Sequence, residues 1–141
     1  MSALAYEKPT DPARSKLMRS VRQRGTRAEE EVASVLRELS VRFRRNVRTL
    51  PGSPDFANRT RRWVIFVHGC FWHHHAECVR ATTPTRNREF WIDKFEANKR
   101  RDQTKTRLLK AMGLDVVTIW ECESCDPGVV KRRIAKLARR Q

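Results

Sequence analysis

The chain has 141 residues, a length that suits one compact domain, and its 31 Lys and Arg against 16 Asp and Glu give a net charge of +15 at pH 7. Its longest apolar run, residues 63–67, is far shorter than the ~20 residues of a membrane-spanning helix, and we expect no secretory signal at the N-terminus. These features exclude a membrane protein, a secreted disulfide scaffold and a multi-domain enzyme. The charge favours a polyanionic partner, nucleic acid first and an anionic membrane surface second.

The N-terminal segment divides into an arm and a basic helix. Residues 1–13 are polar and contain two prolines, so we expect a flexible arm there. Residues 14–24 are rich in Arg and place apolar side chains, Met18 among them, at helical spacing. This pattern predicts a short basic helix at the start of a single domain over residues 14–141.

A helix and three strands are expected next. Thr26 and Glu29 form the T-x-x-E pattern of a capping box, and the apolar residues that follow predict an amphipathic helix over about 27–39. Alternating and apolar runs then predict three strands, the last of them fully buried, at residues 41–47, 55–57 and 63–67.

The second half of the chain predicts a long helix, a strand and a final helix. The long helix covers residues 88–112 and ends at Gly113. The side chains that we expect it to bury are Phe90, Trp91, Phe95, Leu108, Leu109 and Met112. Residues 114–120 form a strand, and Asp126-Pro127 predicts the start of the C-terminal helix. The order α, β, β, β, α, β, α is typical of an α/β sandwich around a small mixed sheet.

Histidines and cysteines are concentrated directly after the buried strand, and all four histidines lie within residues 68–75. The residues with the ligand spacing of a structural zinc site are Cys70, His75 and Cys78. The fourth ligand is Cys122 if the strand before it neighbours the buried strand, with Cys125 as the rival. A site built from all four cysteines is one alternative, and a purely apolar role for the cysteines is another.

Further groups are suited to acid–base or metal chemistry. His68 and His73 are free of the zinc set, and a neutral histidine can accept a proton from water; the alternative is a solvated run that only contacts phosphates. Asp55 and Glu29 are acids able to hold Mg²⁺ against a phosphate. Their alternatives are local, because Asp55 can cap a turn and the capping box alone accounts for Glu29.

The aromatic residues fall into two groups. Trp63 and Trp120 lie in predicted strands, so we expect them in the core. Phe71 and Trp72 lie in the polar histidine segment, so we expect them to be exposed and able to stack on bases or wedge between base pairs. For Trp91, core packing and an outward orientation have equal weight.

At these residues the chain resembles the very short patch repair (Vsr) mismatch endonucleases. The matching segments, in the same order as in the family, are RSKLMRSV (14–21), T-x-A-E (26–29), LPGSPDF (50–56), VIFVHGCFWHHH (64–75), REFW (88–91) and WEC (120–122). The resemblance implies a restriction-endonuclease-like, three-layer sandwich with an αβββαβ core. It also implies an enzyme that nicks one DNA strand 5′ of the thymine in a T:G mismatch formed by deamination of 5-methylcytosine.

The resemblance implies a role for each site residue. The residues implied in catalysis are Asp55 and the Val67 backbone carbonyl as Mg²⁺ ligands, His73 acting on the attacking water, His68 contacting the scissile phosphate, and Glu29 assisting. The implied ligands of a structural Zn²⁺ are Cys70, His75, Cys78 and Cys122. The residues implied in DNA binding are Phe71, Trp72 and Trp91 as wedges beside the mismatch, Met18 entering from the other side, and Lys94 and Asn98 contacting the mismatched bases.

The implied partners are double-stranded DNA with a T:G mismatch and other mismatch-repair proteins, but no membrane. We expect a monomer in the bacterial cytoplasm, associated with the nucleoid through DNA. Two positions depart from the family pattern: Val67 stands where threonine is common, and Cys78 lies one residue further from His75. The rival functions are a zinc-containing DNA-binding module without nuclease activity and a nuclease that cuts unmismatched DNA.

Overall fold

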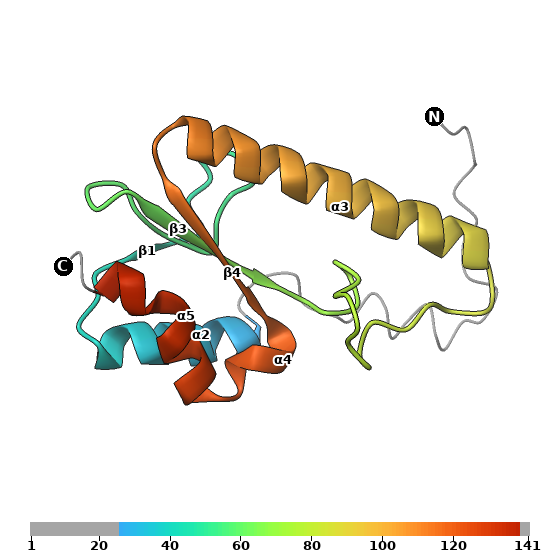
Figure 1. Cartoon of the computed structure of the whole chain (residues 1–141), viewed down its shortest axis with the longest axis horizontal. Coiled ribbons are helices and arrows are strands. Elements are labelled where there is room, and N and C mark those ends of the chain that lie inside the picture. The colour runs from blue at the N-terminus through green and yellow to red at the C-terminus, as the bar shows by residue number, and fades with distance from the viewer. Residues whose placement is uncertain (1–25, 139–141) are drawn as a thin grey trace.

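The computed structural model describes residues 26–138, which form a mixed α/β structure (Figure 1). Its elements are α2 (Arg27–Glu38), β1 (Arg44–Arg45), β2 (Phe56–Asn58), β3 (Trp63–His68), α3 (Arg88–Ala111), β4 (Asp115–Trp120), α4 (Glu121–Ser124) and α5 (Pro127–Ala138). This order confirms the expected sequence of elements, with α4 as an addition. The predicted arm, the basic helix at residues 14–24 and Met18 lie outside the described residues. None of the described helices is long and apolar enough to cross a membrane.

The four strands form one mixed sheet in the order β1-β2-β3-β4. β2 is antiparallel to both β1 and β3, whereas β3 and β4 are parallel. The parallel pair runs in register from Trp63 opposite Asp115 to His68 opposite Trp120. Because the two parallel strands end at the same edge of the sheet, the segments that follow them start side by side.

Helices cover both faces of the sheet, with α3 on one side and α2, α4 and α5 on the other (Figure 1). Trp63 and Ile65 of β3 belong to the core that includes residues of α2 and α5, whereas Val64 and Phe66 belong to the core that includes Leu109 of α3. A strand that is buried on both faces has a continuous apolar sequence. The buried strand predicted over residues 63–67 is therefore confirmed as β3, and among these residues only Val67 is less than fully buried.

The start of α2 follows directly from its sequence. The Thr26 hydroxyl oxygen accepts a hydrogen bond from the Glu29 N–H at 3.2 Å, and the Glu29 carboxylate accepts one from the Thr26 N–H at 2.7 Å. These reciprocal bonds satisfy N–H groups that have no partner inside the helix. They confirm the capping box and hold the Glu29 side chain, which is only 3% exposed, at the N-terminus of α2.

Two predictions are wrong, one about the packing of α3 and one about the length of a strand. Leu108 and Met112 are 48% and 51% exposed, because the end of α3 buries Leu109 and turns the adjacent positions to solvent. The strand predicted over residues 41–47 is reduced to β1. Asn46 has a left-handed backbone with φ of 50°, which ends the extended run directly after β1.

Candidate active site and metal centre

The parallel strands β3 and β4 bring the reactive groups to one edge of the sheet. Cys70 lies two residues after the end of β3, and Cys122 lies two residues after the end of β4, inside α4. The histidine loop is defined here as residues 69–83. Cys122 can reach this loop only if β3 and β4 are neighbours, and the two strands are paired.

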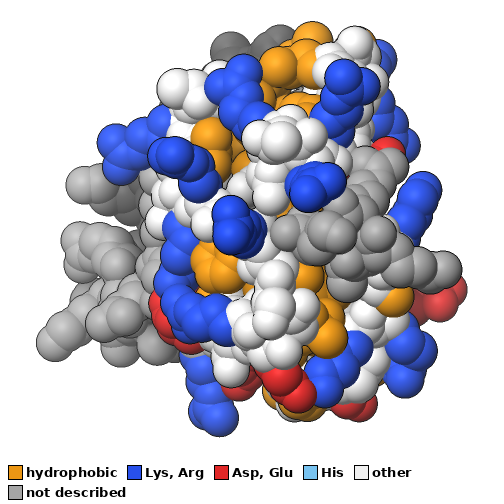
Figure 2. All heavy atoms as spheres, turned by 90° about the vertical axis from the view of Figure 1, so that its left-hand side faces the viewer, with side chains coloured by type: hydrophobic (Ala, Val, Ile, Leu, Met, Phe, Trp, Pro, Cys, Tyr) orange, Lys and Arg blue, Asp and Glu red, His pale blue; other side chains and the backbone are white. Residues whose placement is uncertain are grey.

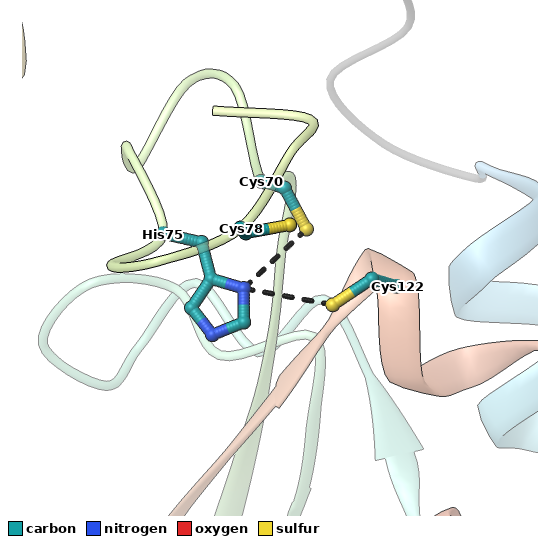
Figure 3. Close-up of side chains that lie close together, drawn as sticks. All are labelled: Cys70, His75, Cys78 and Cys122. Atoms are coloured by element: carbon teal, nitrogen blue, oxygen red, sulfur yellow. Dashed lines mark hydrogen bonds between the residues drawn. The ribbon is translucent and has the colours of Figure 1, made fainter. Parts of the chain in front are cut away.

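Four side chains place their donor atoms within 4.8 Å of one another: Cys70, His75, Cys78 and Cys122 (Figure 3). The His75 Nδ1 atom lies 3.8 Å from the Cys70 sulfur and 3.5 Å from the Cys122 sulfur. The His75 ring is stacked on Trp120, with ring centroids 4.0 Å apart and 8° between the planes. Trp120, which we expected in the core, is half-buried beneath the histidine loop. Its stacking sets the orientation of the His75 ring, so that Nδ1 of His75 faces the sulfur atoms.

This group fits a structural zinc ion. Three sulfur atoms and one imidazole nitrogen are a donor set that tetrahedral zinc commonly takes. Burial raises the pKa of the Cys70 thiol to about 12, so this thiol becomes a thiolate only where a cation compensates the charge. A zinc ion here would join the histidine loop to α4.

Cys125, the rival fourth ligand, is exposed and does not belong to this group. The additional residue before Cys78 is accommodated because His74 and Glu77 adopt left-handed backbone conformations, with φ of 46° and 59°. The Cys78 N–H then donates to the His75 carbonyl at 3.3 Å. The loop thus brings Cys78 to the group despite its departure from the family spacing.

A cavity of about 550 Å³ adjoins the histidine loop and is lined by residues of α2, β3, the loop, α3 and α4. The predicted site residues on its wall are Glu29, Val67, Trp72, His73, Lys94 and Asn98. Three further lining residues of α3 are Arg101, Asp102 and Lys105. The fold therefore brings residues from distant segments to one basic hollow.

His73 is held by an acid from α3. Its Nδ1 atom lies 2.6 Å from the Asp102 Oδ2 atom, so the N–H donates to the carboxylate. This bond leaves Nε2 available to accept a proton, which is the arrangement of an oriented general base. The rings of His68 and His73 are stacked, with centroids 3.8 Å apart and 1° between the planes. A histidine binds a metal ion in the plane of its ring, and one ion cannot lie in both of two parallel ring planes. The cluster of His68, His73 and Asp102 is therefore better suited to moving protons than to sharing a metal ion.

The surroundings set the charge of these groups. Burial is the main cause that lowers the pKa of His68 to about 3, so His68 is neutral near pH 7 and retains one N–H that can donate a hydrogen bond. Burial alone would raise the pKa of Asp102, but the hydrogen bond from His73 and nearby positive charge bring it below its usual value. Asp102 is therefore ionised, the state that orients an imidazole N–H.

Asp55 directly precedes β2, and its Oδ2 atom accepts a hydrogen bond from the Val67 N–H at 2.7 Å. Val67 lines the cavity, whereas Asp55 is not among the lining residues. The bond places the carboxylate beside the Val67 backbone, and carboxylate and backbone carbonyl oxygens are ligands that suit Mg²⁺. A valine is as suitable as a threonine where the ligand is a backbone carbonyl.

Phe71 and Trp72 are partly buried rather than exposed, because they pack against α3 in an aromatic cluster. The Phe71 ring centroid lies 5.5 Å from that of Trp91 and 5.3 Å from that of Phe95. Trp91 is only 5% exposed, which favours core packing for this residue. Of these four rings, only Trp72 lines the cavity, and its carbonyl accepts a hydrogen bond from the Asn98 side chain at 2.8 Å.

Asp102 is a site residue that the sequence motifs missed. It lies four residues after Asn98 and eight after Lys94, so helical periodicity places all three on one face of the predicted helix. This signal was present in the sequence. Periodicity assigns a residue to a face, however, and only the packing of α3 against the loop shows that Asp102 meets His73.

Comparison with known proteins identifies the family. Residues 6–80 match the family described as "DNA mismatch endonuclease Vsr". The type II nicking enzyme V.XorIIP of Xanthomonas oryzae pv. oryzae is 42% identical over 121 residues, covering 86% of this chain and 88% of that protein. The DNA mismatch endonuclease Vsr of Escherichia coli (strain K12) is 42% identical over 109 residues, covering 77% of this chain and 69% of that protein. An oriented histidine on a basic cavity agrees with these likenesses: the chain belongs to the Vsr family and is a DNA endonuclease.

Proposed function

We propose that this chain is a Mg²⁺-dependent endonuclease that nicks one DNA strand 5′ of the thymine in a T:G mismatch, so starting excision repair. The observation that carries the proposal is the His73–Asp102 pair on a cavity wall that also presents Lys94, Arg101 and Lys105. The cations attract the phosphate backbone, and the oriented histidine can activate water for phosphodiester hydrolysis. We also propose that the α/β architecture belongs to the restriction-endonuclease-like class. We propose that the enzyme is a monomer and that it acts on nucleoid DNA in the bacterial cytoplasm.

We assign each group at the cavity, and His68 stacked behind His73, a distinct part in hydrolysis. His73 accepts a proton from the attacking water at Nε2, and Asp102 holds the ring and stabilises the imidazolium that forms. Neutral His68, stacked against His73, donates a hydrogen bond to the scissile phosphate. Glu29 accepts a hydrogen bond from the water and so orients it for attack.

The two metals have different tasks. We assign Mg²⁺ to Asp55 and the Val67 carbonyl, which the hydrogen bond between these residues keeps together. When bound, this cation neutralises the negative charge that develops on the phosphate. We assign zinc to the group of Cys70, His75, Cys78 and Cys122, where a bound ion would keep the histidine loop against α4 and so support the position of His73.

The aromatic cluster supplies a physical basis for choosing a mismatch. We assign Phe71 and Trp72 to the wedge beside the mismatch, with buried Trp91 supporting them from α3. Separating a base step costs a few kcal/mol, and a wobble pair is distorted at lower cost than a Watson–Crick pair. Lys94 and Asn98, assigned to the mismatched bases, lie on the same wall, and the bond from Asn98 to Trp72 connects wedge and reader.

One labelled duplex with T:G, T:A or C:G at the same position tests the proposal, incubated with Mg²⁺ or with EDTA. We expect a nick 5′ of the thymine only in the T:G duplex with Mg²⁺. No nicking of T:G would contradict the proposal, and equal cleavage of all three duplexes would favour a nuclease for unmismatched DNA. Asp55→Ala should lower kcat by roughly 10³-fold or more, whereas Asp93→Ala, at an exposed acid of α3, should not.

A further inference from the structure

We propose that Lys105 is a phosphate-positioning residue, which holds a backbone phosphate of the cleaved strand next to the scissile one. The inference rests on the proposed nicking of DNA. Lys105 lies on α3 three residues after Asp102 and lines the same cavity. With Lys94 and Asn98 these residues recur every three or four positions, so they form one stripe about 16 Å long on the helix. Lys105 ends this stripe, on the far side of the His73–Asp102 pair from the proposed mismatch readers.

The stem of the Lys105 side chain lies directly against Gly52, in the loop that precedes Asp55 and β2. Gly52 has a backbone φ of 77°, and a Cβ atom built at Gly52 would lie 2.6 Å from the Lys105 Cδ atom and 2.9 Å from its Cγ atom. Only a residue without a side chain permits so close an approach. Since Gly52 lies three residues before Asp55, one loop positions both the Lys105 stem and the proposed magnesium ligand.

The ammonium group of Lys105 makes no ion pair within 4.0 Å in the part of the chain that the structure describes. Its charge reaches the catalytic groups, because it helps to lower the pKa of both His68 and Asp102. A partly buried cation whose stem lies against Gly52 and whose ammonium makes no direct ion pair among the described residues suits a phosphate oxygen. Lys105 and Arg101 also line an adjacent hollow of about 450 Å³ with Arg100, so the basic surface continues along α3.

Three variants separate the charge of Lys105 from its packing. Lys105→Met keeps an apolar stem beside Gly52 and removes the ammonium, whereas Lys105→Arg keeps a cation. Lys110→Met is the matched control, because Lys110 is an exposed residue of the same helix that does not line the catalytic cavity. Dissociation constants for T:G and T:A duplexes are measured by fluorescence anisotropy over a range of KCl concentrations in Ca²⁺, and nicking is measured in Mg²⁺.

We expect Lys105→Met to weaken binding of both duplexes about tenfold, clearly more than Lys110→Met does. The slope of log Kd against log salt should fall by about one, and the preference for T:G should stay unchanged, because a phosphate contact carries no sequence information. Lys105→Arg should restore most of the affinity. At saturating DNA, nicking by Lys105→Met should stay within about threefold of wild type, because the contact is made equally before and during cleavage.

Three results would overturn the inference. Binding by Lys105→Met equal to that of Lys110→Met would show that no particular phosphate is held. A lower melting temperature with an unchanged salt slope would show that Lys105 only packs against the loop. A changed preference for T:G over T:A would make Lys105 a reader of bases. Failure of the wild type to nick T:G DNA would instead overturn the proposed function, and the salt slope would still report on Lys105.

Discussion

Two histidines of the same segment acquire different chemistry from their neighbours. His73 donates to an ionised Asp102 and keeps Nε2 free, whereas His68, five residues earlier, is buried with a pKa of about 3. One residue type is thus suited to two roles, a proton acceptor and a hydrogen-bond donor that is neutral near pH 7, because the environments of the two rings differ.

Replacing Asp102 by Asn keeps the shape of the side chain but removes the negative charge that faces His73. We expect kcat for T:G nicking to fall by roughly 10²-fold with little change in KM, because the carboxylate acts on water activation rather than on DNA binding. Single-turnover kinetics over a range of DNA concentrations separates the two constants. Asp93→Asn, at an exposed position of the same helix, is the control. Unchanged kcat in Asp102→Asn would mean that His73 needs no partner.

At the scale of secondary structure, helix starts and strand ends place the reactive groups. The capping box leaves Glu29 on the cavity wall, and the parallel ends of β3 and β4 set the histidine loop beside α4. An ion pair between Arg80 and Glu121, 3.7 Å apart, adds a second connection between the loop and α4. We therefore expect changes at these helix starts and strand ends to affect both stability and catalysis.

Thr26→Ala removes the oxygen that caps α2. We expect a loss of about 1 kcal/mol in the free energy of unfolding, measured by urea denaturation. We also expect a lower kcat, because Glu29 loses its reciprocal bond and its fixed position. Thr26→Ser keeps the hydroxyl and should retain both stability and kcat. Equal stability of the Ala and Ser variants would show that the cap contributes nothing.

The choice of fourth zinc ligand can be tested with two serine variants. We expect one zinc per chain in the wild type and in Cys125→Ser, and none in Cys122→Ser, because only the Cys122 sulfur belongs to the ligand group. Loss of the ion should lower the melting temperature by roughly 10 °C or more. Elemental analysis and thermal unfolding provide the two measurements. Zinc retained in Cys122→Ser and lost in Cys125→Ser would reverse the assignment.

At the scale of the whole molecule, 31 Lys and Arg against 16 Asp and Glu give the net charge of +15. Lys and Arg side chains are distributed across the face in Figure 2, with apolar patches between them. Such charge attracts phosphates of any sequence, so it supplies affinity rather than selectivity. We assign selectivity instead to the rings of Phe71 and Trp72 and to the base contacts proposed for Lys94 and Asn98 on α3.

This division predicts how binding responds to salt. Raising KCl from 50 to 200 mM should weaken binding to T:G and T:A duplexes alike, by about 10³-fold if six or more phosphates are contacted. The ratio of the two affinities should stay nearly constant, because the wedge and the base contacts release few counterions. Titrations of both duplexes at four salt concentrations measure slope and ratio together. If the ratio of the affinities for T:G and T:A duplexes fell steeply with salt, selectivity would depend on charged residues instead.

The sequence alone was sufficient wherever neighbouring residues decide the structure. The capping box of α2, the buried β3 and the start of α5 after Asp126 all appear where the patterns predict them. The reason is that caps and burial periodicity depend on residues within one or two turns of each other. The ligand spacing and the histidine cluster likewise predicted where the reactive groups would gather.

The tertiary structure alone decided which distant residues meet. It selected Cys122 over Cys125, joined Asp102 to His73, packed Phe71 into an aromatic cluster and exposed Leu108. These outcomes depend on the distance and direction between packed segments, because each contact joins side chains from separate elements. Spacing within one segment assigns a side chain to a face of its helix or strand, whereas the packing of α3 and α4 against the histidine loop determines which partner that face meets.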